Sequence, residues 1–122
     1  MKFYKCRHCG NVVVMLNDSG VNPVCCGEKM EELVANTVDA AFEKHLPVVK
    51  VEGNNMHVEV GSVLHPMTEA HLIEFIAVET EHGFQVRKLT KDDQPMADFS
   101  LTEKPVAVYE YCNLHGLWKK EL

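Results

Sequence analysis

The cysteines limit how this chain can fold more than any other feature of the sequence. Four of the five lie in the first 26 residues, as Cys6-x2-Cys9, fifteen further residues, and then Cys25-Cys26. The segment between the two pairs holds one short apolar run, residues 12–16. A segment of about 35 residues with so small a core does not fold through hydrophobic burial alone. We therefore expect a bound metal ion to supply much of its stability.

The spacing of these cysteines favours metal ligands over disulfides. Two thiolates from each of two turns can enclose a metal ion tetrahedrally. Gly10 and Gly27 directly follow the two pairs and let backbone N–H groups approach the sulfurs. No hydrophobic signal segment precedes the first pair, so we expect a cytoplasmic protein, in which thiols stay reduced. His8, inside the first turn, is expected to be exposed and not a ligand.

A four-cysteine module of this kind most commonly indicates a structural zinc ribbon. The adjacent pair Cys25-Cys26 differs from the second C-x2-C of ordinary ribbons and should distort the tetrahedron. Together with a second site that favours a redox metal, this makes iron the better prediction for the first site.

A second group of candidate ligands lies in the rest of the chain. It consists of four histidines and the fifth cysteine: His45, His65, His71, Cys112 and His115. Five ligands exceed the four of a structural zinc site, and a sulfur donor does not suit magnesium or calcium. The set fits a redox metal, with iron favoured, that keeps one coordination position open. An open position is where a small molecule reacts, so the sequence predicts an enzyme.

The chain after residue 47 is predicted to form short strands. Turn signals at 53–55 and 82–83 indicate two hairpins. The predicted strands are 48–51, 56–60, 72–80, 84–89, 97–101, 106–112 and 117–119. Seven short strands without useful helical periodicity predict a β-sandwich. We therefore expect an all-β protein with a metal-stabilised domain at 1–37 and a sandwich at 38–122.

Alternation within the predicted strands assigns the histidines that are not candidate ligands. Met56, Val58 and Val60 should face the core and His57 the solvent, while His82 should lie in a turn. The candidate ligands instead lie in loops or at strand ends, where a sandwich can bring distant loops together.

Charge and hydropathy exclude two classes of partner. The formal net charge is -6 and no basic run is present, which argues against nucleic acid. No apolar run approaches the roughly 20 residues that span a bilayer, so no membrane partner is expected.

With these motifs the chain resembles the desulfoferrodoxins, the two-iron class of superoxide reductase, over essentially its whole length. Its C-x2-C-x15-C-C segment resembles the family's desulforedoxin-like centre. The other matching motifs are Glu43-Lys44-His45-Leu46-Pro47 for E-K-H-x-P, His65-Pro66 with His71, and Cys112-Asn113-Leu114-His115-Gly116 for C-N-x-H-G.

The resemblance implies a fold, an activity and a role for each of these residues. It implies two iron ions per chain, a desulforedoxin/rubredoxin-like domain followed by an immunoglobulin-like sandwich, a homodimer, and reduction of superoxide to hydrogen peroxide with electrons from a small donor such as rubredoxin. Lys44 would attract the anion, and Glu43 would close over the open position in the oxidised state. The implied ligands are Cys6, Cys9, Cys25 and Cys26 at centre I, and His45, His65, His71 and His115 in the equatorial plane with axial Cys112 at centre II.

Three other classes of protein remain as alternatives. A zinc-ribbon scaffold would be colourless and would leave the histidines unexplained. A rubredoxin-like electron carrier would explain centre I but has no use for five further ligands. A non-haem iron oxygenase expects two histidines and one carboxylate.

Overall fold

The structure is a computed structural model that describes residues 1–37 and 42–122, with the side chains of Phe42 and Glu43 excluded. The chain divides into two compact units, Met1–Val34 and Ala35–Leu122, which are described separately. The packing boundary therefore lies a few residues before the expected domain boundary at residue 37. In the part of the chain that the structure describes, no helix is long and apolar enough to span a membrane.

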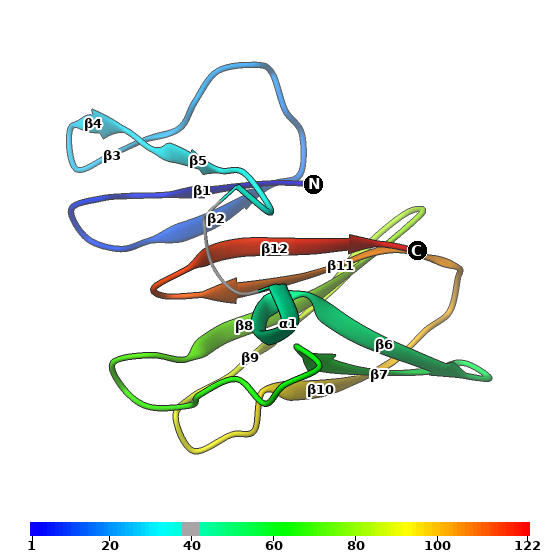
Figure 1. The fold of residues 1–122 in the computed structure, drawn as a ribbon. Coiled ribbons are helices and arrows are strands. Elements are labelled where there is room, and N and C mark those ends of the chain that lie inside the picture. The colour runs from blue at the N-terminus through cyan, green and yellow to red at the C-terminus, as the bar shows by residue number, and fades with distance from the viewer. Residues whose placement is uncertain (38–41) are drawn as a thin grey trace. The chain divides into compact units, whose positions relative to one another are not determined.

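The first unit consists of two small antiparallel sheets (Figure 1). A three-stranded sheet has the order β2-β1-β5, with bounds Val12–Met15, Lys2–Lys5 and Glu31–Leu33. A second hairpin pairs β3 (Val24–Cys25) with β4 (Glu28–Lys29) through a two-residue turn. The core is small: Tyr4, Cys6 and Met30, with Met15 and Cys25 packed against them. So small a core agrees with the expectation that a metal ion stabilises this unit.

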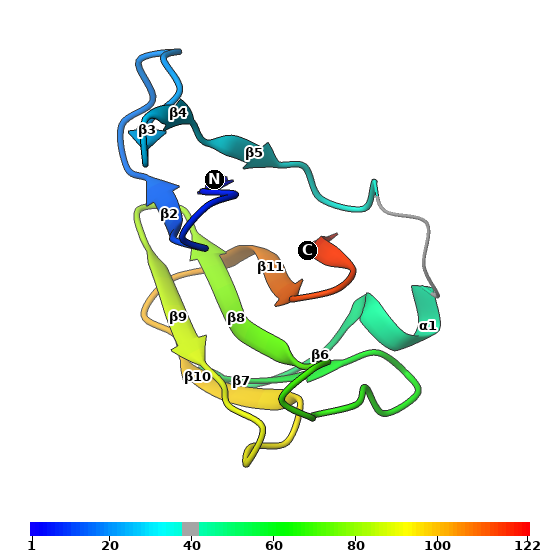
Figure 2. The same ribbon diagram turned by 90° about the vertical axis from the view of Figure 1, so that its left-hand side faces the viewer.

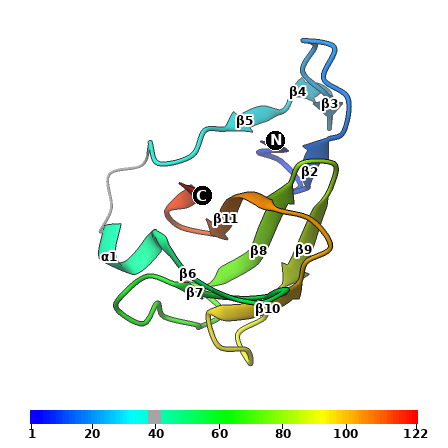
Figure 3. The ribbon, with the colours of Figure 1, turned by 90° about the vertical axis from the view of Figure 1, so that its right-hand side faces the viewer.

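The second unit is an immunoglobulin-like sandwich of the seven expected strands. Its two antiparallel sheets enclose one core, and Figures 2 and 3 show them from opposite sides. One sheet has the order β10-β7-β6, with bounds Met96–Ser100, Asn55–Val60 and Pro47–Glu52. The other has the order β12-β11-β8-β9, with bounds Gly116–Glu121, Pro105–Cys112, Ile73–Thr80 and Phe84–Lys88.

Alternating side chains build the core between these sheets. In β7, Met56, Val58 and Val60 are almost fully buried, while His57 and Glu59 face outward, as predicted. The other sheet contributes Ile76, Val78 and Val108 among others, all fully buried. The hairpin predictions are confirmed as well, because β6 pairs with β7 and β8 pairs with β9.

A single turn of helix, α1 (Phe42–His45), precedes β6 and was not expected from the sequence. A four-residue helix has too few hydrogen bonds to be stable by itself. Its last residue, His45, is only 2% exposed, whereas the preceding Lys44 is exposed. The turn thus directs one histidine into the sandwich and one cation to the solvent.

Candidate metal centres

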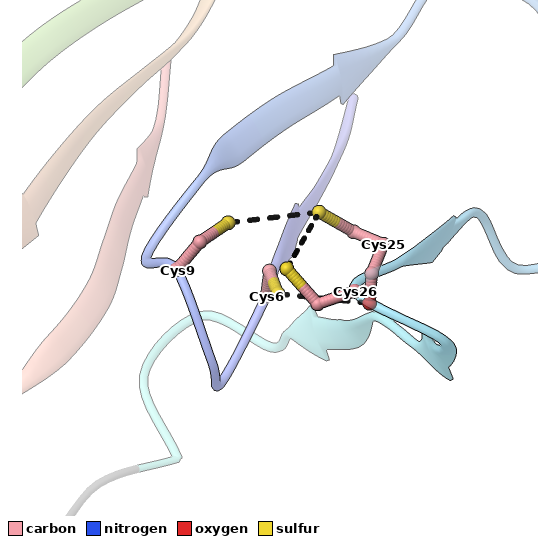
Figure 4. A group of neighbouring side chains, drawn as sticks. All are labelled: Cys6, Cys9, Cys25 and Cys26. Carbon is pink, nitrogen blue, oxygen red and sulfur yellow. Dashed lines mark hydrogen bonds between the residues drawn. The ribbon is translucent and has the colours of Figure 1, made fainter.

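The four N-terminal cysteines form one cluster. Cys6 and Cys9 come from the turn after β1, and Cys25 and Cys26 from the β3–β4 hairpin. Their sulfurs all lie within 4.8 Å of one another and point to a common centre (Figure 4). Cys25 Sγ is 3.6 Å from Cys9 Sγ and 3.9 Å from Cys26 Sγ. A tetrahedron of sulfurs about 2.3 Å from a metal has edges of about 3.8 Å, so the cluster is the right size for one ion.

Backbone conformation brings the two adjacent cysteines into this cluster. Cys26 and Gly27 are both in the left-handed region, with φ of 54° and 76°. A residue with a Cβ rarely adopts that conformation, while glycine does so readily. Two successive left-handed residues turn the chain sharply, so that neighbouring side chains at Cys25 and Cys26 can approach the same point.

The pKa values of two of the clustered thiols are shifted in opposite directions, and a bound cation would allow all four to ionise. The backbone N–H of Cys9 lowers the pKa of Cys6 to about 6, and burial opposes this effect. Hydrogen bonding to Cys9 and then to Cys6 raises the pKa of Cys26 to about 12. Without a metal ion, therefore, one thiol ionises easily and another resists ionisation. Four thiolates at this spacing become compatible when a cation neutralises them, and the donor set therefore fits a thiolate-preferring metal.

Two contacts with carboxylates hold the turn between Cys6 and Cys9, one to β4 and one to β5. His8 pairs with Glu28, and Arg7 Nε lies 2.6 Å from Glu31 Oε2. His8 is exposed and engaged with a carboxylate. This agrees with the expectation that it is not a ligand.

The four candidate histidines and Cys112 form a second cluster in the sandwich unit. His45 ends α1, His65 and His71 lie in the β7–β8 loop, Cys112 ends β11, and His115 lies in the β11–β12 turn. His45, His65 and Cys112 are almost fully buried. Ligand atoms of His45, His65, His71 and Cys112 all lie within 4.8 Å of one another.

The imidazole rings form a closed cycle. His45 Nε2 lies 3.3 Å from His65 Nε2 and 3.0 Å from His115 Nδ1. His71 closes the cycle edge-to-face, with ring centroids 4.7 Å from His65 and 5.1 Å from His115. Four nitrogens about 2.1 Å from a metal in one plane have neighbours about 3.0 Å apart, so this spacing fits a shared ion. Cys112 Sγ lies 3.9 Å from His115 Nδ1.

The contacts and burial of His65 and His71 make their rings suitable metal ligands. His65 Nδ1 lies 2.7 Å from the carbonyl oxygen of Pro66, to which it donates, so Nε2 keeps its lone pair in the neutral ring. Burial lowers the pKa of His65 to about 4 and also lowers the pKa of His71. Within the described residues, His71 Nε2 is buried and has no hydrogen-bond partner. A buried ring nitrogen without a partner is accounted for by a metal ion, so these residues fit one.

The thiol of Cys112 and the charge of Lys44 complete the electrostatic description. Burial raises the pKa of Cys112, and the backbone N–H groups of Leu114 and His115 act in the opposite direction by hydrogen-bonding the sulfur. Lys44 is exposed, and its positive charge contributes to the lowered pKa of His71. Lys44 therefore lies near the cluster. The side chain of Glu43 is outside the described residues.

Comparison with known proteins identifies the family. The family model described as Desulfoferrodoxin matches residues 37–121, and the one described as Desulfoferrodoxin, N-terminal domain, matches residues 1–33. The chain belongs to the desulfoferrodoxin family. A desulfoferrodoxin of Syntrophotalea carbinolica is 46% identical over 99% of this chain and 96% of its own length. One from Nitratidesulfovibrio vulgaris is also 46% identical, over 98% of this chain and 95% of its own.

A solved structure supports the same relationship. The superoxide reductase from Treponema pallidum matches this chain with a TM-score of 0.83 at 37% identity, covering 98% of both chains. A one-iron superoxide reductase from Giardia intestinalis matches with a TM-score of 0.58 at 30% identity, covering 66% of this chain and 99% of its own.

The roles of two residues that hold the histidines were not predicted from the sequence. The indole of Trp118 stacks on His45 with ring centroids 5.0 Å apart and planes 20° apart. Its Nε1–H donates to the carbonyl of His115 at 3.1 Å. Pro66 supplies the carbonyl that orients His65. The signal for Trp118 was its position three residues after His115 in a strand that is otherwise rich in charge.

Proposed function

We infer that this protein is a superoxide reductase, an oxidoreductase that transfers one electron to superoxide and releases hydrogen peroxide. The observation that carries this inference is the single cluster made by a cycle of four imidazoles and the thiol of Cys112. A structural zinc ion needs fewer ligands, and an electron carrier needs no such cluster. The family membership and the likeness to superoxide reductases support the same activity.

We propose that the chain binds two iron ions through the residues of the two clusters. Centre I would be held by Cys6, Cys9, Cys25 and Cys26, and centre II by His45, His65, His71, Cys112 and His115. The spacing of the sulfurs and the cycle of imidazoles support these assignments. The five residues of centre II would hold an iron that could supply the electron for superoxide and an open coordination position for the anion.

The exposed Lys44 would attract superoxide to a chain that is otherwise acidic. Four neutral imidazoles and one thiolate around a ferrous ion leave a formal charge of +1, to which Lys44 adds another. A local positive field can outweigh distant acidic groups because screening at physiological salt acts over about 8 Å. We propose that Lys44 orients the anion and that Glu43, by its resemblance to the family motif, closes the open position after oxidation.

The roles of centre I and of the partners are also proposals. We assign residues 1–37 to a four-cysteine iron domain that stores electrons or stabilises the fold, and 38–122 to the reductase domain. A small electron carrier such as rubredoxin would return the consumed electron. The family resemblance supports a homodimer, and the five free thiols suit the reducing cytoplasm.

Metal content and the visible spectrum test this function. Fresh anaerobic protein should contain two irons per chain, with two thiolate-to-iron absorption components that are reduced in separate steps. One zinc ion and no colour would contradict the proposal and favour a scaffold. One iron with only a four-thiolate spectrum would contradict it and favour an electron carrier.

A further inference from the structure

The side chain of Asn113 joins the loop that carries His71 to the turn that carries the last two ligands. The β8–β11 ladder ends at the pair Ile73 and Cys112. Beyond that pair, Asn113 continues the pairing with its own side chain. Its Oδ1 accepts the backbone N–H of Leu72 at 3.0 Å, and its Nδ2 donates to the carbonyl of Ala70 at 3.0 Å.

These two bonds bracket His71, because Ala70 precedes it and Leu72 follows it. A third bond, from the backbone N–H of Asn113 to the carbonyl of Leu72 at 3.2 Å, holds the same segment. Both side-chain bonds require a group that donates one hydrogen bond and accepts another, as a side-chain amide does. A carboxylate would accept only, and would face the carbonyl of Ala70 with like partial charge.

His71 depends on its backbone for its position more than the other histidines do. His65 is oriented by the carbonyl of Pro66, and His45 by the stacked indole of Trp118. Among the described residues, no hydrogen bond reaches the ring of His71, whose Nε2 has no partner. The backbone of His71 exchanges hydrogen bonds with Thr68 within the same loop, which shapes the loop but does not fix it to β11.

We propose that Asn113 is a positioning residue for centre II, and that its amide sets the place of His71 relative to the turn that bears Cys112 and His115. Groups that hold metal ligands from outside commonly change metal affinity or activity 10- to 100-fold when removed. This proposal rests on the proposed five-ligand centre.

The test uses the full-length protein loaded with iron at both centres. In Asn113→Ala and Asn113→Asp, the rate of ferrous ion loss from centre II to a chelator should rise about 10- to 100-fold. The thiolate-to-iron absorption of oxidised centre II should shift. Centre I, in the other compact unit, serves as an internal standard and should keep its absorption and its iron.

Asn36 provides a matched control. Its Nδ2 donates to the carbonyl of Lys119 at 3.1 Å and its Oδ1 accepts the N–H of Lys119 at 2.9 Å, so it makes the same pair of bonds without flanking a ligand. Asparagine and aspartate both tolerate its positive φ of 61°, so Asn36→Asp is the suitable change. Iron loss from centre II in that variant should stay within about twofold of the unaltered protein.

The outcomes separate this proposal from the proposed function. An unaltered protein that does not hold iron at centre II would overturn both. Normal loading, with iron loss and spectrum in the Asn113 variants indistinguishable from those of Asn36→Asp, would overturn the positioning role alone. If Asn113→Ala does not fold, Asn113→Asp carries the same comparison.

Discussion

Lys44 has an effect at the residue scale that the composition of the chain conceals. The formal net charge is -6, yet the charge of Lys44 reaches His71, where it adds to burial and to the charge of His115 in lowering the pKa. A unit charge about 6 Å from an anion in water contributes about 0.7 kcal/mol. That is enough to change an encounter rate severalfold without changing the fold.

Replacing Lys44 with alanine should therefore slow the second-order reaction of the ferrous protein with superoxide by about threefold. The dependence of that rate on ionic strength should also become flatter, because one attractive charge is lost. Pulse radiolysis at several salt concentrations measures both quantities. Lys91→Ala, an exposed lysine in the β9–β10 loop, is the control. An unchanged rate in Lys44→Ala would remove this residue from the mechanism.

Replacing Glu43 with alanine should change the oxidised state of centre II without changing the rate at which the reduced protein first reacts with superoxide. If Glu43 closes the open position after oxidation, its removal changes the absorption spectrum of oxidised centre II. The rate of the first encounter with superoxide should stay the same, because the reduced site is open in either protein. The absorption spectrum of the oxidised variant measures the first effect, and pulse radiolysis of the reduced variant with superoxide measures the second. A spectrum identical to that of the unaltered protein would argue against the role of Glu43.

Residue types identified the two ligand clusters, whereas atomic detail required the structure. Histidine and cysteine at those spacings were sufficient to select the candidates. No pattern in the sequence states that His45 and His65 present Nε2 while His115 presents Nδ1. That choice follows from ring orientations, which for His45 depend on the stacked Trp118, a neighbour distant in sequence, and for His65 on the carbonyl of Pro66.

At the scale of elements, hydrogen bonds of the Glu103 side chain connect the β10–β11 loop to the β8–β9 turn. Its carboxylate accepts hydrogen bonds from the hydroxyl of Thr80 and from the backbone N–H of His82. His82 Nδ1 is a third partner, 3.0 Å from Glu103 Oε2. These bonds, led by the one from Thr80, lower the pKa of Glu103 from its ordinary 4.5 to about 2.

This shift predicts a dependence of stability on pH. A carboxyl group with a lower pKa in the folded chain than in the unfolded chain stabilises the fold above the unfolded value. The contribution of Glu103 is therefore complete above about pH 4.5 and disappears as the pH falls towards about 2. Glu103→Gln should lower the melting temperature at neutral pH and flatten its decline between these values. Glu81→Gln, in the same turn, should change neither, and equal acid slopes in all three proteins would contradict the prediction.

Strands were predictable where burial alternates and less so where it does not. In β7 the alternation of Met56, Val58 and Val60 with polar residues marks both the strand and its buried face. In β11, residues 107–112 are all buried, so alternation gives no guide to its faces. No pattern in the sequence indicates that Glu110 is fully buried there, where burial raises its pKa well above 4.5.

At the scale of the whole molecule, each ligand set belongs to one compact unit. The four cysteines lie within Met1–Val34, and the histidines and Cys112 within Ala35–Leu122. Each centre can therefore form from residues of its own unit. The boundary between the units was less predictable than the centres. Residues 34–37 contain no proline or glycine, and the composition does not change markedly there.

This division predicts that the two centres can be altered separately. Cys6→Ser should abolish the four-thiolate absorption of centre I and leave the rate of superoxide reaction at centre II within about twofold. The complementary change, Cys112→Ser, should abolish that reaction while the centre I spectrum persists. Loss of superoxide reactivity in Cys6→Ser would contradict the separation.

The proposed activity reduces superoxide and does not dismutate it. Product stoichiometry separates the two activities most directly, when the ferrous protein is mixed with an excess of superoxide and no electron donor is present. A reductase consumes one superoxide per centre II iron above the spontaneous decay, forms one hydrogen peroxide, and stops with the iron oxidised. Continued consumption beyond one superoxide per iron, with one oxygen released for every two superoxide ions, would identify a dismutase and contradict the proposed function.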